Sequence, residues 1–210
     1  MHLPRIVLNW EHLFSKISKF ISYQIDCGKI NSSIFNDKEV VKIQSEKIVF
    51  ATGGYGGKEI KDLKSYWLPI KTFIGVTKPM GNELQSVLKK PLGFSDNRRA
   101  GNYYRVLPGN RLSWGRGISA VGKFTSLSLK RVISKEISYF FPELRHVEID
   151  YVWSGNMAYA SHYMPYVGSI KIGNEEKNVF TLMGFGGHGM NTAPGSAMVL
   201  ADFILGESSK

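Results

Sequence analysis

Asn178-Val-Phe-Thr-Leu-Met183, Gly184-Phe-Gly-Gly-His-Gly189 and Met190-Asn-Thr-Ala-Pro-Gly-Ser-Ala-Met-Val-Leu-Ala-Asp-Phe-Ile-Leu-Gly206 follow one another near the end of this 210-residue sequence. The first segment is apolar and β-prone, the second is rich in glycine, and the third has the apolar spacing of a helix. Glycines let backbone N–H groups approach a ligand closely, and a helix N-terminus adds partial positive charge. The order strand, loop, helix therefore predicts a site for a flat or anionic ligand.

The last helix has start and stop signals of its own. Asn191 or Thr192 is expected to cap it, Pro194 is expected in its first turn, and Gly206 stands at the stop position. One face of the helix is expected to carry the apolar residues Ala193, Ala197, Leu200, Ala201 and Ile204.

Strand-like segments dominate the rest of the sequence. Helices are expected over 10–23 and 124–141, the second one ended by Pro142. Strands are expected at 30–37, 40–43, 47–51, 66–77, 147–153, 166–170 and 179–183, with a hairpin formed by 103–107 and 112–115. The pattern predicts an α+β (mixed α/β) fold class, in which a small α/β part precedes and follows a mostly antiparallel part with one long helix.

Composition favours a globular protein of the cytoplasm. Hydrophobic residues make up 43% of the chain, there is a single cysteine, and no apolar run has the length of a membrane span. No secretory signal pattern is visible, and Cys27 is expected to be an ordinary buried thiol. The net charge of +10 is spread along the chain, which is typical of a solvated surface rather than a nucleic-acid footprint.

Four stretches in series resemble the C-terminal half of the FAD-dependent oxidoreductases of the D-amino-acid-oxidase superfamily. They are the strand and turn at 48–55, the hairpin at 103–115, the run at 141–168, and the loop and helix at 178–206. The resemblance is to the branch with glycine oxidase, sarcosine oxidase and gamma-glutamylputrescine oxidoreductase. It implies a partial FAD-binding Rossmann-like portion and an antiparallel-sheet substrate domain with a long helix. The implied domains are 1–57 (remnant of the FAD-binding domain), 58–170 (substrate domain) and 171–210 (return to the FAD-binding domain).

The resemblance also implies roles for particular residues. The terminal glycine loop would face the flavin ring and stabilise the negative charge that builds up when the ring is reduced. The turn after residue 51 would lie beside the dinucleotide. The cofactor-binding residues implied in this way are Thr52, Gly53, Gly54, Gly186, Gly187, His188, Gly189 and Met190. Tyr103 and Arg105 on the hairpin are candidates for binding a substrate carboxylate, because arginine offers a bidentate fork; the alternative is that Arg105 is a strand residue in a surface ion pair. No metal site is expected, and no catalytic residue is assigned.

The main cofactor signature of the family, G-x-G-x-x-G after a strand and before a helix, does not occur in this sequence. The glycines of 53–57 do not replace it, because no acidic residue follows at the right distance. Some branches of the family tether flavin covalently through a cysteine in the substrate domain; residues 151–168 hold no cysteine, so non-covalent binding of FAD is expected. Without the signature about half of the FAD site is expected to be absent, and whether this chain alone retains FAD stays open. The chain resembles a truncated or split family member, and activity would need the missing N-terminal FAD-binding half, either as a separate chain or in a longer gene product.

The implied function is oxidation of a C–N bond in an amine or amino acid, by hydride transfer to flavin. Two alternatives stay open at the level of sequence. One is a non-enzymatic remnant or binding module, which the weak family match of the N-terminal region suggests. The other is a basic nucleic-acid-binding protein, which the net charge suggests.

Overall fold

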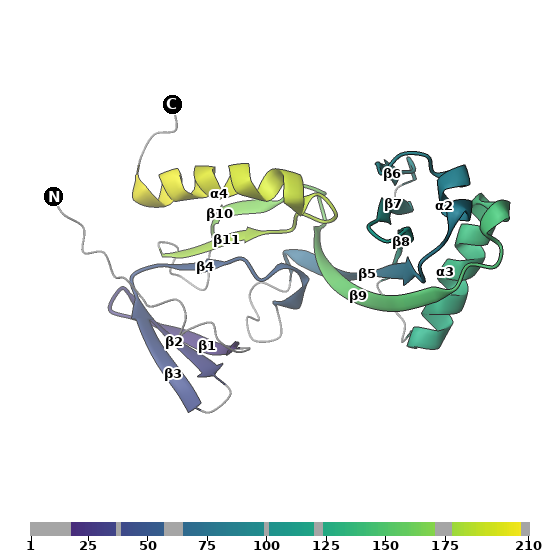
Figure 1. Ribbon diagram of the computed structural model, residues 1–210. Coiled ribbons are helices and arrows are strands. Elements are labelled where there is room, and N and C mark those ends of the chain that lie inside the picture. The colour runs from purple at the N-terminus through teal and green to yellow at the C-terminus, as the bar shows by residue number, and fades with distance from the viewer. Residues whose placement is uncertain are drawn as a thin grey trace.

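A computed structural model of the chain describes residues 18–36, 39–56, 65–98, 101–119, 124–170 and 178–206. Figure 1 shows two lobes, joined by the long strands β5 (Trp67–Thr77) and β9 (Ile149–Ala160), which pair antiparallel along their whole length. Since β5 and β9 pass from one lobe to the other, their two ends pack in different hydrophobic cores: Trp67 and Ala158 in one, Ile149 in the other.

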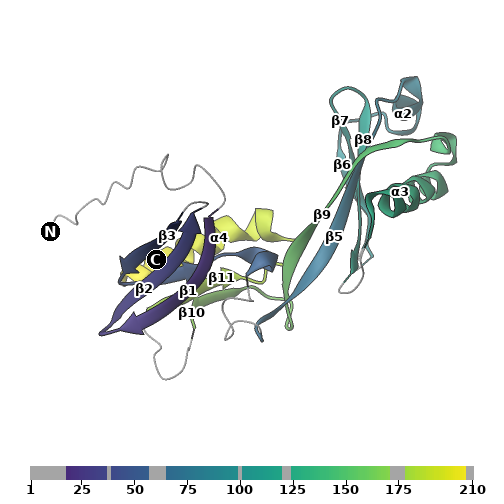
Figure 2. The ribbon, with the colours of Figure 1, turned by 90° about the horizontal axis from the view of Figure 1, so that it is seen from below.

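The first lobe has three layers. Its central sheet has the order β10 (Tyr166–Ser169), β11 (Val179–Met183), β4 (Ile48–Phe50), with β11 parallel to β4. Helix α4 (Gly189–Leu205) lies on one side of this sheet, and the antiparallel meander β1 (Ser18–Asp26), β2 (Lys29–Asn36), β3 (Glu39–Ser45) lies on the other (Figures 1 and 2). The core between sheet and meander holds Ile30, Phe50, Trp67, Ala158, Ile170, Val179 and Met183.

The second lobe is one antiparallel sheet covered on one face. The strand order is β6 (Gly93–Ser95), β7 (Tyr103–Leu107), β8 (Arg111–Ser119), β5, β9. Helix α3 (Ser126–Phe140) packs on it, with the short α2 (Asn82–Val87) and the 3₁₀ turn η3 (Pro142–Leu144) nearby. The fully buried Ile133 sits over Gly75, where a larger residue would collide with it. The other face of the sheet carries Tyr103 and Trp153.

The architecture confirms the mixed α/β fold class and most of the expected elements. The long helix of 124–141, the hairpin and the final strand, loop and helix are all present. The short elements α2 and β6 are not predicted from the sequence. Another 3₁₀ turn, η1 (Gly53–Tyr55), follows β4.

The predicted helix over 10–23 is wrong where it can be checked. Residues 10–17 lie outside the described residues, and 18–23 belong to strand β1. A β-bulge between Phe20 and Ser22 lets Phe20 and Tyr23 both pack against Phe50. An apolar spacing of three residues, which is typical of a helix, therefore arises here from a bulged strand.

Three smaller expectations are also wrong. Helix α4 begins at Gly189 with His188 as its N-cap, so neither Asn191 nor Thr192 caps it and Pro194 lies inside the helix. Cys27 is exposed in the β1–β2 turn, with φ of 47°. Packing in the core or the hairpin is also the expected role of Trp114 and Trp153; Trp114 is fully buried, but Trp153 is half exposed, because among the described residues nothing covers the sheet face opposite α3 there.

Candidate active site

The loop between β11 and α4 keeps several backbone donors free. The Gly186 N–H donates to the Ala158 carbonyl at 2.8 Å, and the His188 N–H donates to the Phe185 carbonyl at 3.1 Å. Within the described part of the chain, no acceptor is recorded for the N–H groups of Gly187, Gly189 and Met190. Because no side chain caps α4 and no acidic residue lies in its first turn, this helix N-terminus is open to an anion.

Gly186 is glycine for a local steric reason. It has φ of +58°, and a Cβ there would lie 2.9 Å from the ring of Tyr159, a β9 residue. The ring thus rests against the loop, and Tyr159 also forms a β-bridge with Phe185. Two of the predicted cofactor residues, Gly186 and Gly187, therefore contact β9 on one side.

The predicted turn after β4 lies against the same strand. A Cβ on the buried Gly54 would come within 2.6 Å of the Asn156 backbone, and the Asn156 N–H donates to the Tyr55 hydroxyl at 3.0 Å. Gly53, with φ of +57°, has open space where a Cβ would stand. The Thr52 hydroxyl donates to the Met183 sulfur at 3.5 Å. Thus β9 holds both the turn and the glycine loop, at Asn156 and at Ala158–Tyr159.

A pocket of about 450 Å³ opens between the glycine loop and the uncovered face of the five-stranded sheet. It brings together Tyr103, Gly187 and His188, three of the predicted site residues. The Tyr103 ring lies over Gly115, and its hydroxyl is 3.4 Å from that of Thr72. The full lining is Thr72, Ser95, Asp96, Arg98, Gly101, Tyr103, Gly117, Met157, Tyr159, Gly187 and His188.

Arg105, the other predicted substrate residue, does not line this pocket. It is two residues beyond Tyr103 on β7 and is exposed. The arginine that does line the pocket is Arg98, and Asp96 already holds it. Its Nε and Nη2 donate to Asp96 at 3.0 and 2.5 Å.

Asp96 organises the loop that forms one wall of the pocket. Its carboxylate also accepts from the backbone N–H groups of Arg98 and Asn102, at 3.0 and 2.9 Å. The bonds from the Arg98 side chain and then the Asn102 amide hold the pKa of this carboxyl well below its usual range. The same ion pair raises the pKa of Arg98.

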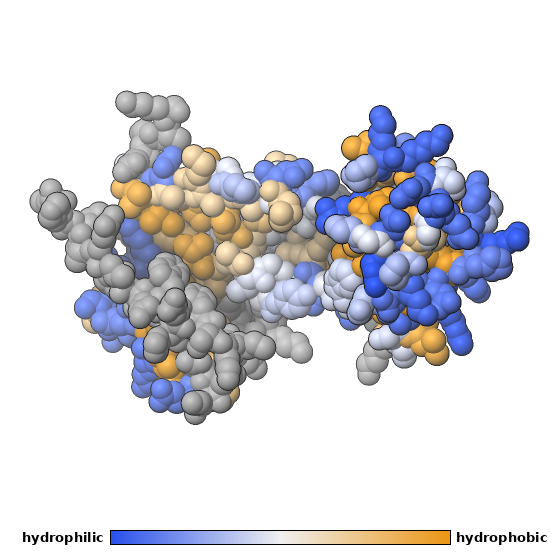
Figure 3. Space-filling view, viewed as in Figure 1, coloured by the Kyte–Doolittle hydropathy of each residue, from blue (hydrophilic) through white to orange (hydrophobic). Residues whose placement is uncertain are grey.

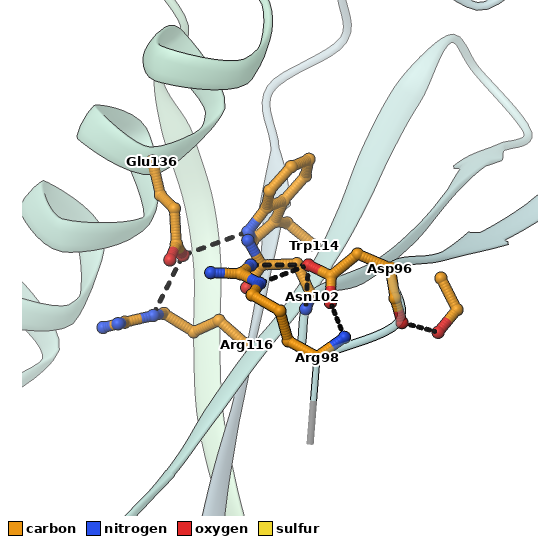
Figure 4. A network of polar contacts seen from close by, with 7 residues as sticks. Asp96, Arg98, Asn102, Trp114, Arg116 and Glu136 are labelled. Atoms are coloured by element: carbon orange, nitrogen blue, oxygen red, sulfur yellow. Dashed lines mark hydrogen bonds and ion pairs between the residues drawn. The ribbon is translucent and has the colours of Figure 1, made fainter. Parts of the chain in front are cut away.

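Figure 4 shows a second acid beside this loop, on α3. Glu136 accepts from the Trp114 indole at 3.2 Å and lies 2.9 Å from the Arg116 Nε. Asp96 and Glu136 are thus each paired with an arginine, Arg98 and Arg116 respectively. Sequence reasoning missed Asp96, Arg98, Thr72 and Tyr159, and only the short D-x-R spacing of the first two is a local signal.

The described residues offer no alternative centre of metal or membrane chemistry. No group of three or more potential metal ligands occurs among them. No helix in the described ranges is long and apolar enough to cross a membrane.

Comparison with known proteins shows which family this fold belongs to. The family model "FAD dependent oxidoreductase" (DAO) matches residues 28–203, and the chain belongs to this family. It is similar to gamma-glutamylputrescine oxidoreductase of Escherichia coli, 24% identical over 171 residues, or 80% of this chain and 39% of that protein. It is also similar to a probable oxidoreductase of Haemophilus influenzae, 27% identical over 144 residues, or 68% of this chain and 31% of that protein.

Solved structures show the same fold at lower identity. Glycine oxidase from Geobacillus kaustophilus superposes with a TM-score of 0.70 at 16% identity, covering 91% of this chain and 49% of that one. L-Proline dehydrogenase from P. horikoshii superposes with a TM-score of 0.65 at 20% identity, covering 91% of this chain and 50% of that one. The chain therefore spans about half the length of these structures and a smaller share of the curated relatives.

Proposed function

We propose that this chain forms the flavin-ring and substrate side of an FAD-dependent oxidoreductase that oxidises a C–N bond of an amine or amino acid. One observation carries the proposal: the uncapped N-terminus of α4 and its glycine loop border a 450 Å³ pocket whose opposite wall is the uncovered sheet face. A planar anionic ring and a small substrate would meet at this border.

FAD, when bound, supplies the hydride acceptor for this chemistry. The free N–H groups of Gly187, Gly189 and Met190 would stabilise negative charge on the ring, which favours its reduced form. Gly186 and His188 would contribute through position, since their own N–H groups are already bonded. The turn Thr52-Gly53-Gly54 would lie beside the dinucleotide, where Gly53 leaves room for close approach.

On the substrate side, the Tyr103 and Thr72 hydroxyls would orient the reacting amine next to Gly187. Arg105 shares the Tyr103 face of β7 and lies about 7 Å further along the strand. It would bind a carboxylate only at the far end of a longer substrate.

We further propose that activity requires a nucleotide-binding half that this sequence does not contain, in a longer polypeptide or as a separate chain. The missing G-x-G-x-x-G and the half-length match to the relatives support this. The single cysteine supports a cytoplasmic setting.

An anaerobic flavin assay tests the function. The chain is co-expressed with the part of the E. coli relative that lies outside its match to this chain, and the purified assembly is mixed with FAD. Glycine, sarcosine, D-alanine and 1,4-diaminobutane are then added in turn. The proposal expects one of these amines to bleach the flavin absorbance of the assembly but not of the isolated chain. Flavin that is bound yet never bleached would favour a non-enzymatic binding module.

A further inference from the structure

We propose that the imidazole of His188 takes up a proton when FAD is reduced, and that in the proposed reaction this proton comes from the ammonium group of the substrate. The inference rests on the proposed function, because it adds a proton acceptor to the hydride acceptor that FAD supplies. It gives the side chain of His188 a role that the backbone of the glycine loop cannot fill.

Hydrogen bonds hold the backbone of His188 in place, while its ring is free. The His188 N–H donates to the Phe185 carbonyl at 3.1 Å. The His188 carbonyl accepts from the N–H groups of Asn191 and Thr192, at 3.2 and 3.3 Å, and from the Thr192 hydroxyl at 2.9 Å. The residue is exposed and lines the 450 Å³ pocket, and no hydrogen bond to its ring is recorded within the described part of the chain. A fixed backbone therefore presents a free imidazole to the pocket.

His188 also lies beside the backbone donors proposed for the flavin ring. Gly187 and Gly189 are its direct neighbours, so their Cα atoms stand about 3.8 Å from its own. Neither glycine has a side chain that could separate the imidazole from a ligand on these donors. A negative charge at the start of α4 would therefore lie close to the imidazole.

Among the described residues that line the pocket, His188 is the one base that can gain a proton near neutral pH. Histidine is the side chain whose charge ordinarily changes between about pH 5 and 8. Asp96 is a carboxylate, but Arg98 and two backbone N–H groups occupy it, and its pKa lies well below the usual range. Tyr103 and Tyr159 carry phenols, which are not bases at this pH. The described lining thus supplies one site for a released proton.

Helix α4 itself brings no carboxylate near His188. Asp202 is the single ionisable residue between Gly189 and Leu205, and at 1.5 Å per residue it lies about 20 Å along the helix. Figure 3 shows a broad hydrophobic area on the lobe that holds α4. Exposed charges so far apart are largely screened by salt, so a reduced ring at the loop is the anion that would balance a charged His188.

The bonds and charges of the reaction balance with this assignment. Oxidation of an ammonium R₂CH–NH₃⁺ breaks one C–H and one N–H bond and gives R₂C=NH₂⁺, a hydride and a proton. The hydride carries both electrons to FAD, and the proton forms a new N–H bond at the free ring nitrogen of His188. The reduced ring is then negative and the imidazolium positive, and each favours the charged form of the other.

The pH dependence of the flavin reduction potential tests this assignment. Each proton taken up with two electrons changes the equilibrium tenfold per pH unit, which is about 30 mV. The potential of the FAD-loaded assembly is measured by dye equilibration from about pH 6 to about pH 9, a range that extends above the ordinary histidine range. We expect the slope for the wild-type chain to exceed the slope for His188→Asn by about 30 mV per pH unit over part of this range.

His146→Asn is the matched control and should keep the wild-type slope. Its ring accepts from the Arg145 side chain at 3.0 Å and lines a different cavity. A second measurement remains decisive if His188→Asn fails to retain FAD. In ¹⁵N NMR of the wild-type assembly, with only this chain labelled, reduction by dithionite at about pH 8 should convert the His188 ring from the neutral to the protonated form.

Equal slopes for the wild-type chain and His188→Asn, or a His188 ring that stays neutral on reduction, would overturn the assignment. If amines still bleach the flavin in that case, the proposed function stands. Proton uptake by His188 on reduction by dithionite, without bleaching by any amine, would support the proton site and refute the proposed function. An assembly that never binds FAD would refute both.

Discussion

Tyr159 and Gly186 show how single residues define the site. The ring of Tyr159 occupies the space where a side chain at Gly186 would stand, and the Gly186 N–H reaches across to β9. The glycine loop can therefore pack against the Tyr159 ring only because residue 186 has no side chain.

Replacing Gly186 by alanine should lower the free energy of unfolding by about 1–3 kcal/mol, because the backbone has a positive φ and the methyl group meets the ring. Urea unfolding of the purified chain measures this. Gly195→Ala is the control within α4: nothing lies within 4 Å of the added Cβ. That variant should gain about 0.5–1 kcal/mol from helix propensity. Equal effects at the two positions would contradict the packing described.

Asp96 should stay ionised in acid. Its folded pKa is depressed, so the stabilisation it gives is present above the unfolded pKa of about 3.9 and is lost only as pH falls through the lower folded value. Carboxyl ¹³C NMR should therefore show that Asp96 stays ionised from about pH 5 to about pH 3, a range that brackets the unfolded pKa. A midpoint near 3.9 would mean that Arg98 and Asn102 do not hold it in solution.

At this scale the sequence could indicate the glycine loop but not its partners. Four glycines beside an apolar run are a local signal, and Gly187, Gly189 and Met190 do present free donors. Tyr159 reaches the loop only because β9 passes between the lobes, which no local spacing reveals. The chemistry of its guanidinium group makes Arg105 a candidate in the sequence, whereas the arginine that lines the pocket is Arg98, on the loop that Asp96 organises.

Among the elements, α3 illustrates a helix fixed by both its cap and its packing. Thr125 and Ser128 form a reciprocal capping box, with both bonds at 3.1 Å, and Ile133 and Ile137 are fully buried. These signals are local, and the helix was predicted to within two residues. By contrast, the bulge in β1 places Phe20 and Tyr23 on the same face, against the distant Phe50. The apolar residues of this strand are therefore spaced as in a helix, which led to the wrong prediction.

Thr125→Ala should destabilise the chain by about 1 kcal/mol, because the Ser128 N–H in the first turn of α3 loses its acceptor, the Thr125 hydroxyl. Thermal unfolding followed by circular dichroism measures the change. The neighbouring exposed Ser126→Ala should stay within about 0.5 kcal/mol of wild type. If the two variants melt alike, the capping box contributes nothing in solution.

The whole molecule consists of two lobes, each with its own hydrophobic core. The α3-covered sheet buries Trp114 and Leu112 fully, whereas Val49 of β4 and Phe203 of α4 stay exposed among the described residues. The strand order β10-β11-β4 joins residues 48–50 to 179–183 across most of the chain, and no local spacing in the sequence reveals that pairing.

Hydrogen–deuterium exchange tests the central claim most directly, namely that the loop before α4 contacts the flavin. The assembly of the chain with the nucleotide-binding half is compared with and without FAD. The account predicts slower exchange at the amides of Gly187, Gly189 and Met190 when FAD is bound, with Gly186 little changed because its N–H is already bonded to Ala158. Tight FAD binding that leaves the exchange of these three amides unaltered would contradict it.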